Sequence, residues 1–323
     1  MNAFGSALRS PRTRVVAGRI LLDAGLVLGG ALVLAALYVL VANDGGRAYD
    51  TRAYWLAGQH ALNGSPLYVR ADYSTLDIYT YPPIFAQLFA PAALLPELLV
   101  AWLWRVSGVL CLRYIVGSWK ASVVACLFIP LLTELSLGNV TLQIAAVLIF
   151  TLRDRRGAYL MPWVVALKFG PVLLVPYLWL WRPECRRPLV IGSLIFGAAC
   201  LLSAAVSPSS WTGYFDMLGW QNGAQLGGSQ VLHLIGGSGG LDFVVRFGLA
   251  AAVALLGTYQ RRAWLVYAAA AITCPVLAIS RLAPLVGLWR FRPGGDRPGA
   301  VDRPAAVDGQ GPAERPVTAA APL

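Results

Sequence analysis

The stretch from Leu21 to Ala42, LLDAGLVLGGALVLAALYVLVA, decides the fold class of this chain, because Asp23 is its one charged residue. A helix of roughly 20 apolar residues crosses the hydrocarbon core of a bilayer. Only helices and closed barrels satisfy their own backbone hydrogen bonds in lipid. A barrel strand would alternate apolar and polar residues over about ten positions, whereas this run is continuously apolar. It therefore predicts a transmembrane helix.

The composition extends this prediction to the whole chain. Of 323 residues, 58% are hydrophobic and 13% are charged, and the mean hydropathy is +0.63. Soluble globular domains carry about 25% charged residues. Further apolar runs follow the first one, so we expect an all-α protein, a polytopic transmembrane helix bundle of about nine or ten spans.

The positive charge is distributed in a way that predicts the topology. The net charge is +11, but the arginines gather at the ends of apolar runs, as at 153–156, 182–187 and 261–262. This is the positive-inside pattern of cytoplasmic loops rather than a nucleic-acid-binding surface. We expect residues 1–19 to be a cytoplasmic basic N-terminus, 20–290 the membrane-embedded domain of a multi-pass plasma (inner) membrane protein, and 291–323 a disordered cytoplasmic tail.

Two long polar segments, about residues 43–81 and 207–240, fall on the outer side in this topology. The first is much longer than the usual connection of about 2 to 8 residues between helices. Within it, TRAYWLAGQHAL has the periodicity of an amphipathic helix lying at the membrane interface. Asp50 stands at its start, where it would either cap the helix or act on a substrate, since ionisable groups near the bilayer are costly and are commonly functional.

Lys168 is a lysine within an apolar run, and Gly170 and Pro171 directly after it break the helix. A broken helix carrying a charge is typical of ion and substrate sites in membrane proteins. The alternative is that the side chain snorkels to a surface.

Other polar and aromatic residues allow both a structural and a functional interpretation. In YTYPP, Tyr79 and Tyr81 would begin a helix or form an aromatic wall for a sugar. In GNVTLQ, Asn139, Thr141 and Gln143 would bind substrate or neighbouring helices. The cysteines show no metal-ligand spacing, and no Asp-x-Asp pair or histidine cluster calls for a bound metal, so we expect none.

Four blocks in this order resemble the signature of family 87 of the glycosyltransferases: YDTRAYWLAGQHALNGSPLY, YTYPPIFAQLFAPAALLP, LGNVTLQIAAVLIFTL and ALKFGPVLLVPYLWLWR. The resemblance covers roughly Leu21 to Arg187. It implies a GT-C-like membrane enzyme that takes a hexose, mannose first among them, from a polyprenyl-phosphate sugar and needs no cofactor. The acceptor would be a glycolipid or a glycan at the outer face of the bilayer.

The resemblance also implies roles for individual residues. Asp50 matches the catalytic aspartate of the first outer loop and would act as general base in an inverting transfer. The leaving phosphate is a stable anion, so one carboxylate suffices, unlike the pair in glycoside hydrolysis. The remaining predicted site residues are Lys168, Arg52 and His60 for the donor phosphate, Tyr54, Tyr79, Tyr81, Asn139 and Gln143 for the substrates, and Gln230 and His233 in the second outer loop.

Two other functions stay open from the sequence. A transporter or flippase of a lipid-linked glycan would also use a broken helix around Lys168, although no inverted repeat is visible. A non-catalytic subunit of cell-envelope assembly is the other alternative.

Overall fold

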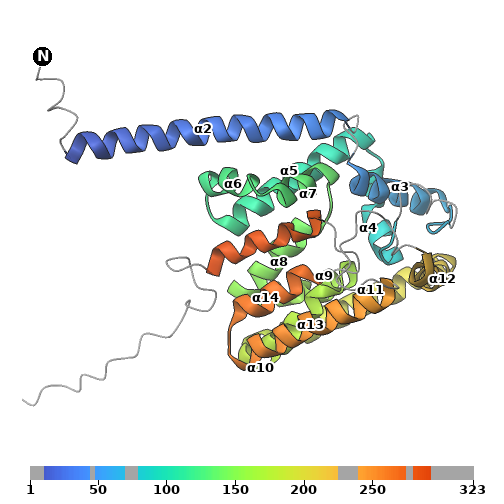
Figure 1. Ribbon diagram of the computed structural model, residues 1–323. Helices are drawn as coiled ribbons and strands as arrows, with labels where there is room; N and C mark the ends of the chain where they lie inside the picture. The colour runs from blue at the N-terminus through green and yellow to red at the C-terminus, as the bar shows by residue number, and fades with distance from the viewer. Residues whose placement is uncertain (1–10, 44–47, 70–78, 225–238, 274–278, 292–323) are drawn as a thin grey trace, which may run out of the picture.

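The computed structural model describes residues 11–43, 48–69, 79–224, 239–273 and 279–291, and every regular element in these ranges is a helix (Figure 1). The prediction of an all-α chain with membrane-spanning segments is confirmed for this part of the protein. The helices are many and short, and they surround one central helix, α8 (Thr141–Arg153).

The first element, α2 (Pro11–Asn43), is 33 residues long, which corresponds to about 50 Å of helix. It begins inside the segment expected to be the basic N-terminus and runs along one side of the bundle, with its N-terminal end projecting past the other helices (Figure 1). Lys120 of α6 (Trp119–Cys126) donates to Asp23 of α2 at 2.7 Å and ties the two helices together.

Two segments of the described residues are long and apolar enough to cross a membrane: α5 (Glu97–Val116) and the segment Pro183–Val206. The latter joins the short η4 (Pro183–Cys185) to α11 (Arg186–Val206). A bent pair, α6 and α7 (Ile129–Leu137), would make a third. The count of nine or ten spans stays a prediction.

The apolar stretch 122–137 is not one straight helix. The chain forms α6 and α7 instead, bent by 96° at the break between them. Pro130 lies in the first turn of α7. Since proline has no N–H to donate to the carbonyl four residues earlier, the preceding helix cannot continue through it.

The apolar segment around Lys168 is interrupted, as its sequence predicted. It consists of α9 (Met161–Leu167), η3 (Gly170–Leu174) and α10 (Val175–Trp181), and α9 is preceded by η2 (Arg155–Leu160). Lys168 is the C-cap of α9 and has extended backbone angles, φ −147° and ψ 124°. The helix therefore ends at this lysine, before the proline.

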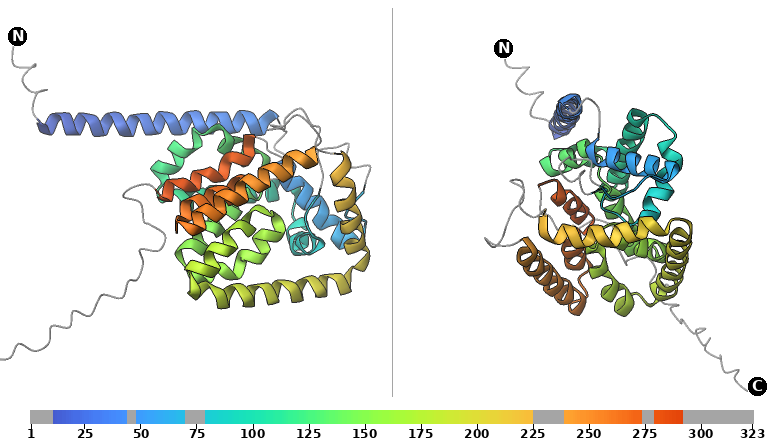
Figure 2. Two further views of the ribbon diagram at one scale, coloured as in Figure 1. Left: turned by 60° about the horizontal axis from the view of Figure 1, so that its bottom comes forward. Right: turned by 90° about the vertical axis from the view of Figure 1, so that its right-hand side faces the viewer.

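The second polar segment is also partly helical, because α12 (Pro208–Ala224) occupies its first half. It lies at the same end of the bundle as α3 (Tyr49–Asn63), the helix predicted in the first outer loop, and α4 (Pro83–Ala93) (Figure 1). Figure 2 shows α12 rising at the end of α11. The last elements are α13 (Gly239–Tyr259), α14 (Ala263–Ile272) and η5 (Ile279–Phe291).

The central helix α8 contributes to two buried cores. On one side Leu148 and Ile149 pack with Leu174, Leu178 and Tyr267 from η3, α10 and α14. On the other side α8 packs with α5, α6 and α7, and that cluster consists of Leu112, Ile115, Val116, Ala125, Cys126, Leu131, Leu135, Leu142, Ala145 and Ala283. Because α8 is held from both sides, the residues at its start are fixed relative to the whole bundle.

Gly138 joins α7 to α8 at a point of close contact. It is the C-cap of α7 with φ +66°, a left-handed conformation that L side chains rarely adopt. A Cβ there would also collide with Thr51 Oγ1 and stand 2.8 Å from Ala48 Cβ. Only a glycine therefore allows α3 to approach the start of α8.

A pair of glycine variants separates backbone strain from this collision. Gly64 also has φ +66°, but nothing lies within 4 Å of a Cβ added there. We expect Gly64→Ala to lower the free energy of unfolding by about 1 kcal/mol and Gly138→Ala by about 3 kcal/mol or more, because it adds overpacking. Thermal unfolding of the purified protein in detergent measures both, and equal losses would contradict the close contact.

Candidate active site

The start of α8 gathers polar side chains from three parts of the chain. Asp50 comes from the first turn of α3, Asn139 and Thr141 from the α7–α8 junction, and Lys168 from the break after α9. Asn139 and Thr141 are each 4% exposed, and Asp50 and Lys168 are half-buried. The structure therefore brings together three of the residues predicted as site residues: Asp50, Asn139 and Lys168.

Asn139 connects the carboxylate to the ammonium group. Its Nδ2 donates to Asp50 Oδ2, and its Oδ1 accepts from Lys168 Nζ at 2.8 Å. Thr141 Oγ1 donates to the same Oδ1 at 2.8 Å and accepts from Lys168. A neutral amide with both a donor and an acceptor is suited to this position, because it holds an anion on one side and a cation on the other.

Asp50 does not cap α3, contrary to the structural interpretation of its position. The N-cap is Ala48, and no side chain caps the helix. Asp50 is the second helical residue, where its charge still interacts favourably with the helix dipole. Its Oδ1 has no hydrogen-bond donor among the residues that the structure describes.

Two further contacts hold the α7–α8 junction, the first of them to α3 and the second within the junction itself. Thr51, 1% exposed, donates from Oγ1 to Gly138 O at 2.9 Å. Glu134, also 1% exposed, accepts from the Thr141 backbone N–H at 3.2 Å. The sequence analysis missed Thr51 and Glu134. An acidic residue inside the apolar stretch FIPLLTELSLG is the signal that would have found Glu134.

The predicted phosphate ligands Arg52 and His60 lie away from this network. Arg52 Nε is 4.0 Å from Glu97 Oε1 at the start of α5. His60 is ten residues beyond Asp50 on α3, about 15 Å along the axis, and its Nδ1 is 2.9 Å from Pro66 O. His60 lines a separate pocket between the end of α3 and the start of α12. Their phosphate role stays a prediction, and the structure does not bring them to Lys168.

The predicted tyrosines form an aromatic cluster one turn along α3 from Asp50. The Tyr54 and Tyr81 hydroxyls are 3.3 Å apart, and Tyr79 Oη donates to Pro82 O at 3.1 Å. Burial raises the pKa of Tyr79 well above the usual range of a phenol, so its hydroxyl stays protonated. Edge-to-face contacts join Tyr54 to Tyr81 and Trp104. The hydroxyls bond within the cluster, which favours a packing role.

The remaining predictions divide between helix packing and undescribed residues. Gln143 Nε2 lies 2.8 Å from Ser107 Oγ of α5. In the better amide orientation its oxygen accepts from Ser107 and its nitrogen stands 3.2 Å from Asn139 O and Val140 O. This supports the helix-packing interpretation. Gln230 and His233 lie outside the described residues.

A small pocket opens beside Lys168 and Thr141. Its walls come from α8, η3, α14 and η5: Thr141, Ile144, Ala145, Leu148, Lys168, Pro171, Ala270, Ala271, Thr273 and Pro284. Asp50 does not line it, so Asp50 and Lys168 share a hydrogen-bond network rather than one pocket wall. This pocket is largely apolar with a cation at its edge.

A double-mutant cycle tests whether Asn139 and Lys168 are coupled. Lys168→Met removes the ammonium group, and Asn139→Ala removes its acceptor. Because each change breaks the same bond, we expect a coupling free energy of unfolding of about 1 kcal/mol or more. The control is the same cycle with Thr133→Val in place of Asn139→Ala. Thr133 Oγ1 donates along its own helix, to Ile129 O at 3.1 Å, so its change should be additive with Lys168→Met. Additive effects for Asn139 and Lys168 would contradict the network.

Comparison with known proteins identifies the family. The model of glycosyltransferase family 87 matches residues 79–303, which is more than half of the chain. The match extends into the C-terminal third, beyond the blocks that carried the resemblance, and includes Asn139 and Lys168, whereas Asp50 precedes it. No curated protein and no solved structure matches the chain significantly. The chain belongs to glycosyltransferase family 87.

Proposed function

We propose that this glycosyltransferase moves a hexose, mannose in the first instance, from a polyprenyl-phosphate sugar to a glycolipid or glycan acceptor at the outer face of the plasma membrane. The observation that carries the proposal is the convergence of Asp50 and Lys168 on Asn139. The family match supports glycosyl transfer, and the apolar helices support a lipid-borne donor.

Asp50 acts as the general base in this proposal. The acceptor hydroxyl attacks the anomeric carbon from the side opposite the phosphate, and its proton passes to the Asp50 carboxylate. One carboxylate oxygen is held by Asn139, while Oδ1 faces no protein donor among the described residues. The amide thus orients the base and leaves an oxygen for the acceptor.

Lys168 stabilises the departing phosphate. As the bond between the anomeric carbon and the phosphate oxygen breaks, its electron pair stays on the oxygen and negative charge grows there. A fixed cation near that oxygen lowers the barrier by electrostatic stabilisation. Asn139 and Thr141 hold the ammonium group in place. The anomeric configuration inverts because the displacement is a single step.

Asp50→Asn tests the base. The substitution keeps the size of the side chain but removes proton acceptance, so we expect kcat to fall about 10²- to 10⁴-fold. Transfer from radiolabelled polyprenyl-phosphate mannose in membrane preparations measures it. Asp216→Asn is the matched control, since Asp216 is exposed on α12 at the same end of the bundle, and its activity should change less than about twofold.

Two outcomes would overturn separate parts of this proposal. Unchanged transfer by Asp50→Asn would refute the base assignment while leaving the donor intact. Absence of transfer by the wild-type protein from every polyprenyl-phosphate sugar supplied would refute the donor class and favour a non-catalytic role.

Lys168→Met tests the phosphate partner. Loss of a charge-assisted contact costs about 1.5–3 kcal/mol, so kcat/KM for the donor should fall roughly 10- to 100-fold. Lys168→Arg keeps the charge and should recover part of this loss. A Met variant with wild-type kcat/KM, or an Arg variant no better than Met, would contradict a cationic role.

A further inference from the structure

A second polar feature lies at the other end of α8. Thr141 and Arg153 are separated by twelve residues, about 18 Å along the helix. Just past Arg153, η2 and the start of α11 enclose a hollow of about 440 Å³ lined by Arg155, Arg156, Tyr159, Glu184, Arg187, Pro188 and Ile191. This basic pocket, as we call it, plays no part in the proposed reaction.

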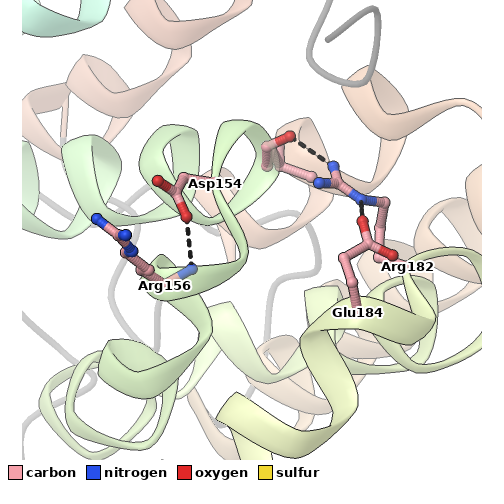
Figure 3. Close-up of polar contacts among 5 residues, drawn as sticks. Asp154, Arg156, Arg182 and Glu184 are labelled. Atoms are coloured by element: carbon pink, nitrogen blue, oxygen red, sulfur yellow. Dashed lines mark hydrogen bonds and ion pairs between the residues drawn. The ribbon is translucent and has the colours of Figure 1, made fainter. Parts of the chain in front are cut away.

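No close polar contact within the described residues holds the arginine side chains of the basic pocket, although Glu184 lies near enough to Arg155 to interact with it electrostatically. The guanidinium groups of Arg155, Arg156 and Arg187 make no ion pair or hydrogen bond with the described residues. Asp154 accepts from the backbone N–H of Arg156 at 2.8 Å, not from its side chain (Figure 3). Three cations therefore face the hollow, against one carboxylate, Glu184, among its lining residues.

The one carboxylate among the lining residues, that of Glu184, forms an ion pair with an arginine that does not line the hollow. Glu184 Oε1 accepts from Arg182 Nε, and Arg182 Nη1 donates to Leu152 O at 2.7 Å (Figure 3). This pair fixes η4 against the end of α8. Because Glu184 is paired with Arg182, which does not line the hollow, the net charge of the wall remains strongly positive.

Close packing builds this cluster from two separate segments. A Cβ on Gly192 of α11 would stand 2.5 Å from Tyr159 O and 2.8 Å from Tyr159 Cα. Glycine at this position lets α11 lie directly on η2. Arg187 is thereby held beside Arg155 and Arg156, although it is more than 30 positions away in the sequence.

The face of α11 beyond the pocket is apolar. Ile191 follows Arg187 by one turn, and Leu194 and Ile195 follow Ile191 by three and four residues, so they share a face. Leu194 is 68% and Ile195 54% exposed. A ligand with a phosphate in the pocket and an acyl chain along this face would match both the charge and the apolar surface.

We propose that the basic pocket binds the phosphate of an anionic membrane phospholipid, with its acyl chains along α11. The clusters at 153–156 and 182–187 lie on the side that the positive-inside pattern assigns to the cytoplasm. Anionic lipids are concentrated in that leaflet, and each nearby arginine strengthens binding by about 1 kcal/mol. This lipid site is independent of Asp50 and Lys168.

Native mass spectrometry of the purified protein tests the lipid site, with phosphatidylglycerol or phosphatidylcholine added to the micelles. We expect preferential binding of phosphatidylglycerol, weakened roughly 25-fold by Arg156→Gln with Arg187→Gln. Arg19→Gln with Arg262→Gln is the control, removing the same charge from exposed residues elsewhere. It should leave the affinity within about twofold.

Several results would overturn the proposal. Equal binding of the two lipids would show that the pocket does not select an anionic lipid, and wild-type affinity in the pocket variant would show that the arginines do not bind its phosphate. Displacement of the lipid by excess inorganic phosphate would point to a soluble anion instead. Should the double variant unfold, Arg187→Gln alone, expected to weaken binding about fivefold, gives the same test with less disturbance.

Discussion

The hydrogen bonds of the Asn139 side chain are the constraint around which the candidate site is organised. A buried polar group in an apolar bundle costs free energy unless a partner satisfies it, and Asn139 is 4% exposed. Its donor is used by Asp50 and its acceptor by Lys168 and Thr141. A single amide thus fixes α3, the start of α8 and the end of α9 relative to one another.

This arrangement depends on helix ends rather than on helix interiors. Asp50 is in a first turn, Asn139 lies between α7 and α8, and Lys168 ends α9. Irregular backbone is tolerated at membrane depth where it is buried in protein or lines a cavity. The short helices around α8 provide such breaks, and Gly138 allows one of them to touch α3. Longer, straighter helices would carry the same residues but keep them apart.

The sequence predicted the chemistry of this network better than its geometry. Asp50 and Lys168 stood out because charge is rare in an apolar chain, and the helix of the first outer loop followed from periodicity. Whether Asp50 caps α3 depended on whether the helix begins at Tyr49 or two residues later, which periodicity does not resolve. Glu134 and the buried Arg105, which donates to Ser136 O at 3.1 Å, were not predicted, because their contacts join α7 to α8 and α5 to α7 and depend on how these helices pack.

The proposed chemistry suits a site that is partly buried, because its total charge stays constant during the reaction. Before transfer, Asp50 and a phosphodiester donor carry one negative charge each and Lys168 one positive charge. Afterwards Asp50 is protonated, and the charge it lost is on the phosphate monoester. Changing the net charge of a low-dielectric site would be costly. Here negative charge moves from the Asp50 side of Asn139 to the Lys168 side. Since Asn139 stands between Asp50 and Lys168, this transfer of charge requires the reacting groups to lie near both side chains at once. A substrate bound wholly in the pocket beside Lys168 would leave Asp50 without a proton to accept, so the acceptor has to approach from the α3 side.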